Sequence, residues 1–317
     1  MTTTIQKILY AGLFGVLITM TSCEQLLEVE TPANQIDKSM VFEDVQTADA
    51  ALAGLYAGVR DNSILAGDKL GPVLGTYADD LDNYAVTTAN GIIDLYRNQQ
   101  IENNTVIYSL WLSTYQQVYV ANAILEGVED AQNLPQAAKQ RIKGEALFLR
   151  SLLLYYQQQL YGDIPYPVTT NYMINQGIGK TPSAEVLERL ESDLRESAGL
   201  LTDAYTNTER IFANRKTAQM LLAKVLMQQG RWSEAETLLK GIIQNTNYVW
   251  EPDVSKMFLK AGKHIIFQLK PALPGDPTRE ALIYFFGTAA PTEYALSPAL
   301  VNSFAAADLR KQKWIAS

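Results

Sequence analysis

The stretch that most constrains the fold occupies residues 144–168 and has the sequence GEALFLRSLLLYYQQQLYGDIPYPV. Apolar residues recur there at steps of three and four, which puts them on one stripe of a helix. The stripe consists of Ile142, Ala146, Leu149, Leu153, Tyr156 and Leu160. Gly162 can take the left-handed conformation that ends helices, and Pro165 and Pro167 hold the following chain extended. The stretch therefore predicts a central core helix, covered on more than one side, whose rigid exit turns the chain away from the bundle.

The same periodicity recurs along most of the chain and indicates a mainly α-helical protein. Helices are expected over residues 39–60, 105–128, 138–160, 183–201, 215–229 and 234–243. The last two carry a tetratricopeptide-like pattern of small and large residues, namely Ala223, Leu226, Ala235, Leu239 and Ile242. One such pair cannot bury its own faces, so neighbouring pairs are required. We expect the helix over 39–60 to pair with 105–128, and 138–160 with 183–201.

Local signals predict where some helices begin and how they are bridged. Thr181 before Pro182 is typical of an N-cap followed by a first turn. Ser233 with Glu236 predicts a capping box. Asn122 lies among apolar neighbours, so its amide is expected to cap or bridge helices.

Two regions break the helical pattern. Residues 76–101 read TYADDLDNYAVTTANGIIDLYRNQQI and have no steady period. Long irregular stretches of this kind in a compact domain are often functional. From Asn247 onward, short apolar runs alternate with proline and glycine. Within that region HIIFQLK could form a short strand, and the remainder is expected to be loop.

Composition excludes several classes of function. The formal net charge is −8 and no basic cluster stands out, which argues against binding nucleic acid or an anionic membrane by charge. The chain has one cysteine, Cys23, and one histidine, His264. An internal disulfide is therefore impossible, and a Cys/His zinc site or a His-dependent catalytic triad is disfavoured. A lone histidine on an apolar stretch is more often a packed or surface residue than a catalyst.

The first segment has the pattern of an export signal. Lys7 precedes an apolar run from Ile8 to Ile18, which is too short to span a bilayer as a stable anchor. Thr21 and Ser22 then precede Cys23, and small residues before a lone cysteine resemble a bacterial lipobox. We favour cleavage before Cys23 and lipidation of its thiol over a plain secretory signal with an incidental cysteine.

Taken in order, these strings resemble the SusD/RagB family of Bacteroidetes outer-membrane lipoproteins. The resemblance covers essentially the whole chain. It rests on the Cys23 lipobox, FEDVQTADAALAGLYAGVR, Trp111 with Tyr115 and Ala121-Asn122, TPSAEVLERLESDL, RIFANRKTAQMLLAKVLMQQGRWSEAE, and Leu296-Ser297-Pro298 to Asp308-Leu309-Arg310. Its strongest string is GEALFLRSLLLYYQQQLYGDIPYPV, including Gly144, Glu145, Ala146, Leu149, Arg150, Gly162, Asp163, Pro165 and Pro167.

The resemblance implies a tetratricopeptide-like helical superhelix with an irregular, loop-rich side. It implies a lipoprotein signal peptide at 1–22, a tether at 23–38, a SusD-like N-terminal region with helix pairs at 39–245, and the start of a C-terminal region at 246–317. Family members usually continue with more repeat helices, so we expect a truncated gene product or fragment in preference to an unusually short member.

Family function is implied in the same way. Members are lipid-anchored at the outer membrane, exposed at the cell surface, and sit as a lid on a TonB-dependent, SusC-like transporter. They capture nutrients, commonly glycans, for import, and they bind without catalysing; no cofactor or metal is implied. Oligosaccharide is the expected ligand, with glycopeptide and peptide left open.

Candidate ligand residues come from the irregular regions. Sugar rings stack their C–H faces on tyrosine or tryptophan, and their hydroxyl groups bond to Asp and Asn. The candidates are Tyr77, Asp79, Asp80, Asp82, Asn83, Tyr84, Tyr96, Trp250 and Tyr294. Trp111 and Trp232 are assigned to helix packing.

Two other classes of function remain as alternatives. A tetratricopeptide scaffold for protein partners would share the helices but would not explain the lipobox or the aromatic loops. A glycoside hydrolase could draw two carboxylates from Asp79, Asp80 and Asp82, although no barrel pattern supports one. Calcium binding by the same residues is disfavoured because the spacing lacks the glycine and terminal glutamate of an EF-hand loop.

Overall fold

The computed structural model describes residues 38–86, 90–287 and 289–315. The predicted signal peptide, Cys23 and the predicted tether up to residue 37 lie outside the described residues. The chain divides into two units, Met1–Met40 and Val41–Ser317, and the description below concerns the second.

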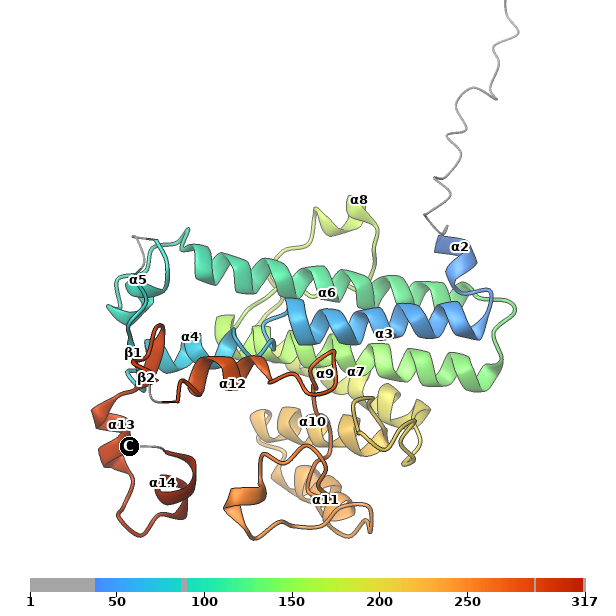
Figure 1. Cartoon of the computed structure of the whole chain (residues 1–317). Coiled ribbons are helices and arrows are strands. Elements are labelled where there is room, and N and C mark those ends of the chain that lie inside the picture. The colour runs from blue at the N-terminus through green and yellow to red at the C-terminus, as the bar shows by residue number, and fades with distance from the viewer. Residues whose placement is uncertain (1–37, 87–89, 288, 316–317) are drawn as a thin grey trace, which may run out of the picture. The chain divides into compact units, whose positions relative to one another are not determined.

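Helices make up most of the described chain, as predicted (Figure 1). In order, the elements are α2 (Lys38–Val41), α3 (Val45–Asn62), α4 (Leu70–Tyr77), β1 (Leu81–Asn83), α5 (Ile92–Tyr96), α6 (Thr105–Asp130), α7 (Gln136–Tyr161), α8 (Tyr172–Asn175), α9 (Ser183–Leu200), α10 (Arg215–Gln228), α11 (Trp232–Ile243), the 3₁₀ turn η2 (Val254–Lys256), α12 (Arg279–Tyr284), β2 (Tyr294–Leu296), α13 (Pro298–Ser303) and α14 (Leu309–Trp314).

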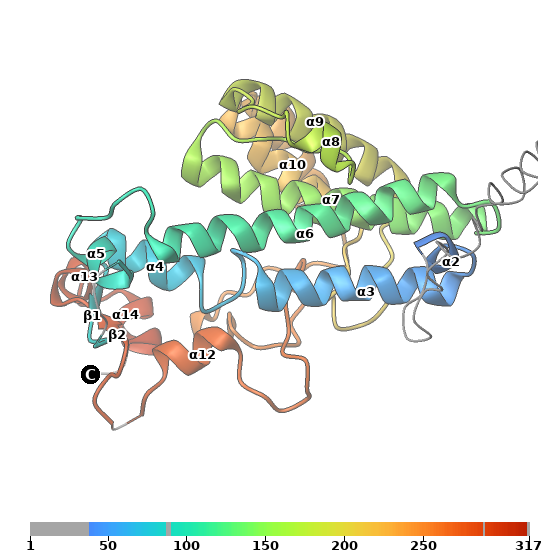
Figure 2. The ribbon, with the colours of Figure 1, turned by 90° about the horizontal axis from the view of Figure 1, so that it is seen from above.

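Helix α7 is the centre of this unit, as its wide apolar stripe predicted. It packs against α6 on one side and α9 on the other, and it also contacts α3 and α10 (Figures 1 and 2). Ile142, Leu149 and Leu153 are fully buried there, and Phe148 is nearly so. The expected pairs are present, because α3 packs on α6 and α7 on α9.

The last pair, α10 and α11, has the close approach that its small residues predicted. Ala223 and Ala235 are both buried between the two helices, together with Leu226 and Ile242. Helix α9 covers the other side of α10. The order α6, α7, α9, α10, α11 thus stacks each helix on its sequence neighbour, as in other repeat architectures.

The exit turn after α7 differs from its prediction. Gly162 does take a positive φ of 71°, which favours glycine. The chain then stays against the bundle, because the Tyr115 hydroxyl donates to the Pro165 carbonyl at 2.8 Å and Asn122 Nδ2 donates to the Pro167 carbonyl at 3.0 Å. The expectation that the turn leads the chain away was wrong, since tertiary hydrogen bonds from α6 hold it.

Three predicted helix starts also need correction. The helix expected over 39–60 is broken, because the Asp44 carboxylate caps a new helix by accepting the backbone N–H groups of Gln46 and Thr47. Thr181 pairs with Ile164 in an isolated β-bridge and does not cap α9. The first N–H of α9 donates instead to Asp163 Oδ1 at 2.8 Å, so the cap comes from a residue far back in the chain.

The capping box predicted at Ser233 and Glu236 is likewise not used. Helix α11 begins one residue earlier than Ser233, and its N-cap residue, Arg231, makes no side-chain capping bond. Arg231 instead forms ion pairs with Glu191 and Glu234, which tie the start of α11 to α9.

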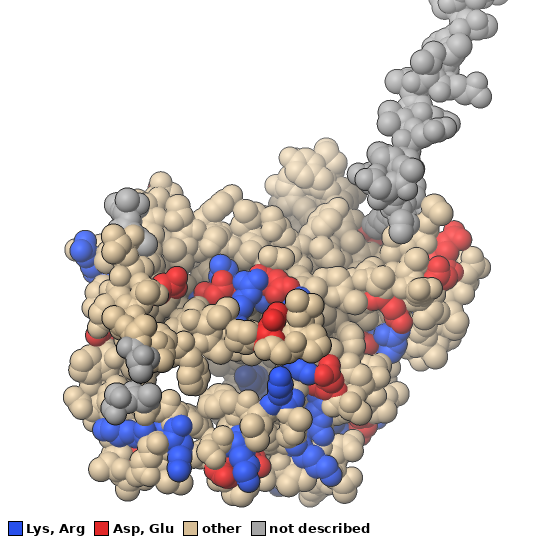
Figure 3. Space-filling view, in the orientation of Figure 1, with Lys and Arg blue, Asp and Glu red and all other residues tan. Residues whose placement is uncertain are grey.

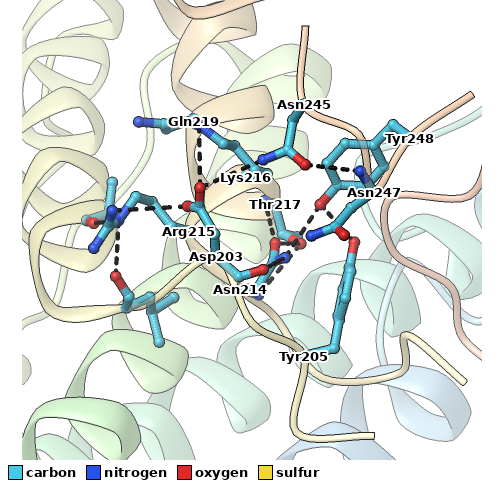
Figure 4. A network of polar contacts seen from close by, with 12 residues as sticks. Asp203, Tyr205, Asn214, Arg215, Lys216, Thr217, Gln219, Asn245, Asn247 and Tyr248 are labelled. Atoms are coloured by element: carbon cyan, nitrogen blue, oxygen red, sulfur yellow. Dashed lines mark hydrogen bonds and ion pairs between the residues drawn. The ribbon is translucent and has the colours of Figure 1, made fainter. Parts of the chain in front are cut away.

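A polar network fastens the segment after α11 onto the start of α10 (Figure 4). Asn214 caps α10 by accepting the Thr217 N–H at 2.9 Å, and its Nδ2 donates to the Tyr248 hydroxyl at 3.1 Å. The Tyr205 and Tyr248 hydroxyl oxygens lie 2.7 Å apart, and Tyr205 also donates to the Ile266 carbonyl. Burial raises the pKa of Tyr205 far above its usual value. The network positions residues 246–268, in which η2 is the one regular element, and the strand suggested for HIIFQLK is not formed.

Candidate binding site

Part of the stretch that was expected to be irregular is organised by a two-stranded ribbon, and Ile92–Tyr96 of the same stretch form helix α5. Strand β1 pairs antiparallel with β2, and Asn83 lies opposite Tyr294. Backbone bonds extend the ribbon at both ends, from the Tyr84 N–H to the Glu293 carbonyl (2.7 Å) and from the Ser297 N–H to the Asp80 carbonyl (2.9 Å). Two predicted ligand regions that are far apart in sequence therefore meet in one place (Figure 1).

The approach to β1 is a tight turn after α4. Asp79 adopts a positive φ of 62°, and the Asp80 N–H donates to the Gly75 carbonyl at 2.8 Å. A Cβ at Gly75 would lie 2.8 Å from the Leu81 side chain, so only glycine lets buried Leu81 pack there. This packing fixes which face of β1 points inward.

Side chains alternate across a strand, so the ribbon has two faces. Asp82 and Tyr84 lie on one face, where the Tyr96 hydroxyl of α5 approaches Asp82 Oδ1 at 3.4 Å. The Asp82 carboxylate raises the pKa of Tyr96, with smaller contributions from burial, Asp79 and Tyr84. Asp79, Asp82, Tyr84 and Tyr96 are thus neighbours, and we call them the acid–tyrosine face.

Asn83 and Tyr294 lie on the other face of the ribbon. Burial raises the pKa of Tyr294 to about 12, with further contributions from Glu293, Tyr284 and Asp68. Asn83 Oδ1 accepts the Ala85 N–H, while its Nδ2 is buried without a partner among the described residues. Tyr294 was predicted as a ligand residue, and its half-buried position separates it from the acid–tyrosine face.

The remaining predicted residues are not equally placed. Tyr77 ends α4 and keeps close to half of its side chain exposed, and Asp80 is exposed while its backbone joins the ribbon. Trp250 is 84% exposed in the segment after α11. Among the described residues, no hydrogen bond or ring contact joins Trp250 to the ribbon, so the structure does not bring it to the acid–tyrosine face.

Sequence reasoning missed the support that α12 gives to this region, because LIYFFG was expected to be loop. Thr278 caps α12 by accepting the Ala281 N–H, and Arg279 forms ion pairs with Asp68 (3.0 Å) and Asp61 (3.7 Å) before α4. Tyr284 reaches back toward Gly71 of α4, where an added Cβ would lie 3.2 Å from the tyrosine hydroxyl. The Thr-x-x-Ala start with Arg279 was the available signal, but the partner carboxylates lie too far away in sequence to be identified.

A cavity lies elsewhere in the unit. It has a volume of about 610 Å³ and is lined by α7, α10 and residues 257–268, including Phe148, Met220, Lys224, Phe258 and His264. His264 Nε2 lies 3.1 Å from the Met257 carbonyl, so this ring holds its own loop. Figure 3 shows the surface hollowed between α12 and the segment after α11. The cavity walls are mainly apolar, which suits a hydroxyl-rich ligand less well than the acid–tyrosine face does.

Trp111 and Trp232 were predicted to pack between helices, and the structure supports this for one of them. The Trp111 ring packs between Tyr115 and Tyr161, with ring centroids 4.9 and 5.0 Å away. Trp232 is exposed at the start of α11 and borders an apolar groove with Leu239 and Ile243. The prediction for Trp232 was therefore wrong, because no further helix in the described chain covers that side of α11.

The tyrosine rings of the acid–tyrosine face can stack on a sugar ring, and its carboxylates can accept hydrogen bonds from sugar hydroxyl groups. Within the described ranges, no group of three or more His, Cys, Asp or Glu side chains could hold a metal ion. None of the helices in that part of the chain combines the length and the apolarity that a bilayer-spanning segment needs.

Comparison with known proteins identifies the family. A family model described as "Starch-binding associating with outer membrane" matches residues 27–227. The chain belongs to this SusD-like family. SusD-like protein P25 from Formosa agariphila is 26% identical over 219 residues, which is 67% of this chain and 41% of the relative. The chain spans about half the length of the curated relatives that it matches.

Solved structures share the fold. A SusD superfamily protein from Bacteroides fragilis superposes with a TM-score of 0.70 at 22% identity, covering 86% of this chain and 67% of the other. Surface glycan-binding protein A from Bacteroides thetaiotaomicron, in complex with laminarihexaose, gives a TM-score of 0.69 at 18% identity, covering 84% and 62%. At these identities the likeness establishes the SusD-like fold of this chain and nothing about its ligand.

Proposed function

We propose that this SusD-like chain is a surface lipoprotein that binds a nutrient glycan and passes it to a TonB-dependent outer-membrane transporter. The observation that carries the binding proposal is the acid–tyrosine face, where Asp82, Tyr84 and Tyr96 meet on an open ribbon. Family membership supports it, as does a relative of the same fold in complex with laminarihexaose. A TonB-dependent, SusC-like transporter is the proposed partner, and Cys23 is the proposed lipid attachment point that holds the protein at the outer-membrane surface.

The proposed contact set keeps the residues predicted from sequence and ranks them by position. Asp79, Asp82, Tyr84 and Tyr96 make direct contact in this proposal, and neighbouring Tyr77 extends the aromatic surface. The proposed role of Asp80, Asn83 and Tyr294 is to support the ribbon. Trp250 would contact only a ligand long enough to extend beyond the acid–tyrosine face. The protein binds without turnover and needs no cofactor.

Isothermal titration of the purified chain with laminarihexaose tests the glycan proposal. We expect saturable binding that weakens about 2- to 12-fold in Tyr84→Ala, since an aromatic stacking contact contributes about 0.5–1.5 kcal/mol. Trp232→Ala removes an exposed aromatic ring from α11 and is the matched control, with unchanged affinity expected. Equal affinity in both variants would place the ligand elsewhere, and failure of wild type to bind a panel of glycans would reject the proposal.

Two further measurements address the alternatives. Release of shorter sugars during prolonged incubation would favour the hydrolase and contradict a pure binder. For the anchor, Cys23→Ala should leave the outer-membrane fraction, and a variant that stays there would show that the lipoprotein proposal is wrong.

A further inference from the structure

The cavity beside α7 and α10 is bounded by one stripe of each helix. Its lining recurs at steps of three and four along them, so successive lining residues lie one turn apart. These helical residues include Phe148, Leu152, Tyr156, Thr217, Met220 and Lys224. The third wall is the segment of residues 257–268, which runs between α11 and α12 (Figure 1). The volume of about 610 Å³ is that of a small-molecule pocket, for which about 300–1,000 Å³ is usual.

Hydrogen bonds to the backbone fix the third wall in place. The Arg210 guanidinium donates to the Ile265 carbonyl and, at 2.8 Å, to the Asn247 carbonyl. Gln268 Nε2 donates to the Glu209 carbonyl at 2.7 Å. The wall is therefore preformed, and a ligand would not have to order it on binding.

The cavity has one aromatic end and one polar end. At the aromatic end, the Phe148 and Phe267 rings meet edge to face with centroids 5.5 Å apart, and Phe148 is 2% exposed. This end offers a ligand only apolar contacts.

The polar end carries a cation and a hydroxyl group. Gln228 Nε2 donates to Gln159 Oε1 at 3.3 Å, so the carboxyl-terminal parts of α7 and α10 lie side by side. Tyr156 and Lys224 each precede one of these glutamines by about one helical turn, so they lie near each other. Phe148 lies two turns before Tyr156, about 12 Å back along α7.

The protein itself does not use these two polar groups. Within the described residues, the Lys224 ammonium makes no ion pair or hydrogen bond, and the Tyr156 hydroxyl has no hydrogen-bond partner. Other polar groups of the lining are occupied, because the Thr217 hydroxyl is bonded to Asn214 Oδ1 at 3.0 Å and His264 Nε2 to a carbonyl of its own loop. Lys224 and Tyr156 are thus the groups that a ligand could engage.

The walls carry positive charge without negative charge. Residues 146–162, 210–233 and 254–275 include Lys and Arg but none of the chain's 34 Asp and Glu residues. No carboxylate among the described residues lines the cavity. A cationic ligand would therefore find no counter-ion there, and a sugar would find too few acceptors for its hydroxyl groups. A ligand with an apolar body and one anionic group fits both ends.

We propose that this cavity binds an amphiphilic carboxylate, a molecule with an apolar tail and a single anionic head group. The tail lies against Phe148 and Phe267, and the carboxylate pairs with the Lys224 ammonium and accepts a hydrogen bond from the Tyr156 hydroxyl. The site is separate from the acid–tyrosine face, and the proposal does not rest on the proposed glycan function.

Three probes that share a ten-carbon chain test the proposal: decanoate, decanol and decyltrimethylammonium. Isothermal titration of the purified full chain should show saturable decanoate binding, decanol binding at least about threefold weaker, and no binding of the ammonium compound, because only the carboxylate pairs with Lys224. Lys224→Gln should weaken decanoate binding at least about threefold and leave decanol binding unchanged. Lys180→Gln changes an exposed lysine outside the cavity and should alter neither affinity.

A second pair of variants tests the location. Met220→Trp should fill the cavity and weaken the binding of decanoate and decanol at least about tenfold, because the tail loses its space. Met173→Trp makes the same change at an exposed position on α8 and should have no effect. Circular dichroism checks that each variant is folded; if Met220→Trp is not, the selective loss in Lys224→Gln decides.

Three results would overturn the proposal. Wild type that does not bind decanoate would remove the site. Equal affinity for decanoate and decanol, unchanged by Lys224→Gln, would show that the cavity takes neutral apolar molecules. Decanoate binding that a folded Met220→Trp variant retains would place the ligand elsewhere. Laminarihexaose affinity, measured separately, decides the glycan proposal, and none of these results alters it.

Discussion

Two polar clusters in this molecule are built in opposite ways. Around the exit turn, Arg150 pairs with Asp193 at 2.6 Å and donates to Asn122 Oδ1 at 2.8 Å, while the Tyr166 hydroxyl donates to the same aspartate. Arg150, Asn122 and Tyr166 are buried, the Asp193 side chain is 16% exposed, and Arg150, Asp193 and Asn122 each bond more than one partner. On the acid–tyrosine face, Asp82 and Tyr96 share one long contact and lie at the surface. The first arrangement specifies the fold, and the second leaves its polar groups available to a ligand.

This comparison explains which part of the sequence could be recognised. Buried groups with several partners tolerate few replacements, because removing one partner leaves another unsatisfied. Exposed polar groups with one weak contact tolerate many replacements. Hence the most recognisable string of the chain is architectural, and the candidate ligand residues carry no motif.

The largest effect is expected at Arg150. Arg150→Met should lower the free energy of unfolding by about 3–5 kcal/mol, because it leaves the largely buried Asp193 carboxylate without its cation. Urea unfolding measures this. Arg310→Met, which removes an exposed pair with Asp308, is the control and should change stability by less than about 1 kcal/mol. Similar losses of stability in both variants would mean that the polar cluster around Arg150 contributes no more to stability than an exposed ion pair does.

A pH dependence comes next, from Glu145 in the same architectural region. Burial raises the pKa of Glu145 to about 6, although the Tyr56 hydroxyl donates to it at 2.7 Å and Arg141 lies at 3.2 Å. A raised carboxyl pKa favours the folded state below the unfolded value of 4.5, and this contribution is lost as pH rises through 6. The contribution of Glu145 to the free energy of unfolding at low pH is about 2 kcal/mol.

The matched variant isolates that contribution. Glu145→Gln keeps the shape and removes the titration, so between pH 4.5 and 7.5 wild type should lose about 2 kcal/mol more stability than the variant does. Other carboxylates titrate equally in both proteins and cancel. Parallel stability curves for the two proteins would contradict the assignment.

A smaller effect is expected at the cap that the turn supplies. Asp163→Ala should cost about 1 kcal/mol, because the first N–H of α9 loses its acceptor. Asp163→Asn keeps an acceptor oxygen in place and should lower the free energy of unfolding by only a few tenths of a kcal/mol. Equal costs would indicate that charge near the helix start, and not the hydrogen bond, is what Asp163 provides.

The helices were predictable from sequence because one apolar stripe is enough to specify each of them. The helix ends were not predictable where a residue distant in sequence provides the cap. The apolar period located α6, α7, α9, α10 and α11 to within a few residues of their ends. Thr181 failed as a cap because Asp163 reaches the same N–H group from the other side of the loop. The pairing of β1 with β2 could not be foreseen, since three-residue strands carry no usable pattern. For the same reason Tyr294 was grouped with residues from which the ribbon separates it.

The smallest effect on stability is expected at Asp82, and it is the sharpest test of the comparison. Asp82→Asn should change the free energy of unfolding by no more than about 0.5 kcal/mol, because the residue is partly exposed and makes one long contact. It should nevertheless lower the pKa of Tyr96, since the Asp82 carboxylate is the main cause of that raised value. Ultraviolet titration of wild type against a Tyr96→Phe variant identifies the Tyr96 transition. Asp80→Asn, a neighbouring change that does not act on Tyr96, should leave that transition in place. If Asp82→Asn leaves the pKa of Tyr96 unchanged, the two side chains do not interact and the acid–tyrosine face is not a single site. A shift in the pKa of Tyr96 at unchanged stability is the behaviour of a site whose polar groups are left open for a ligand.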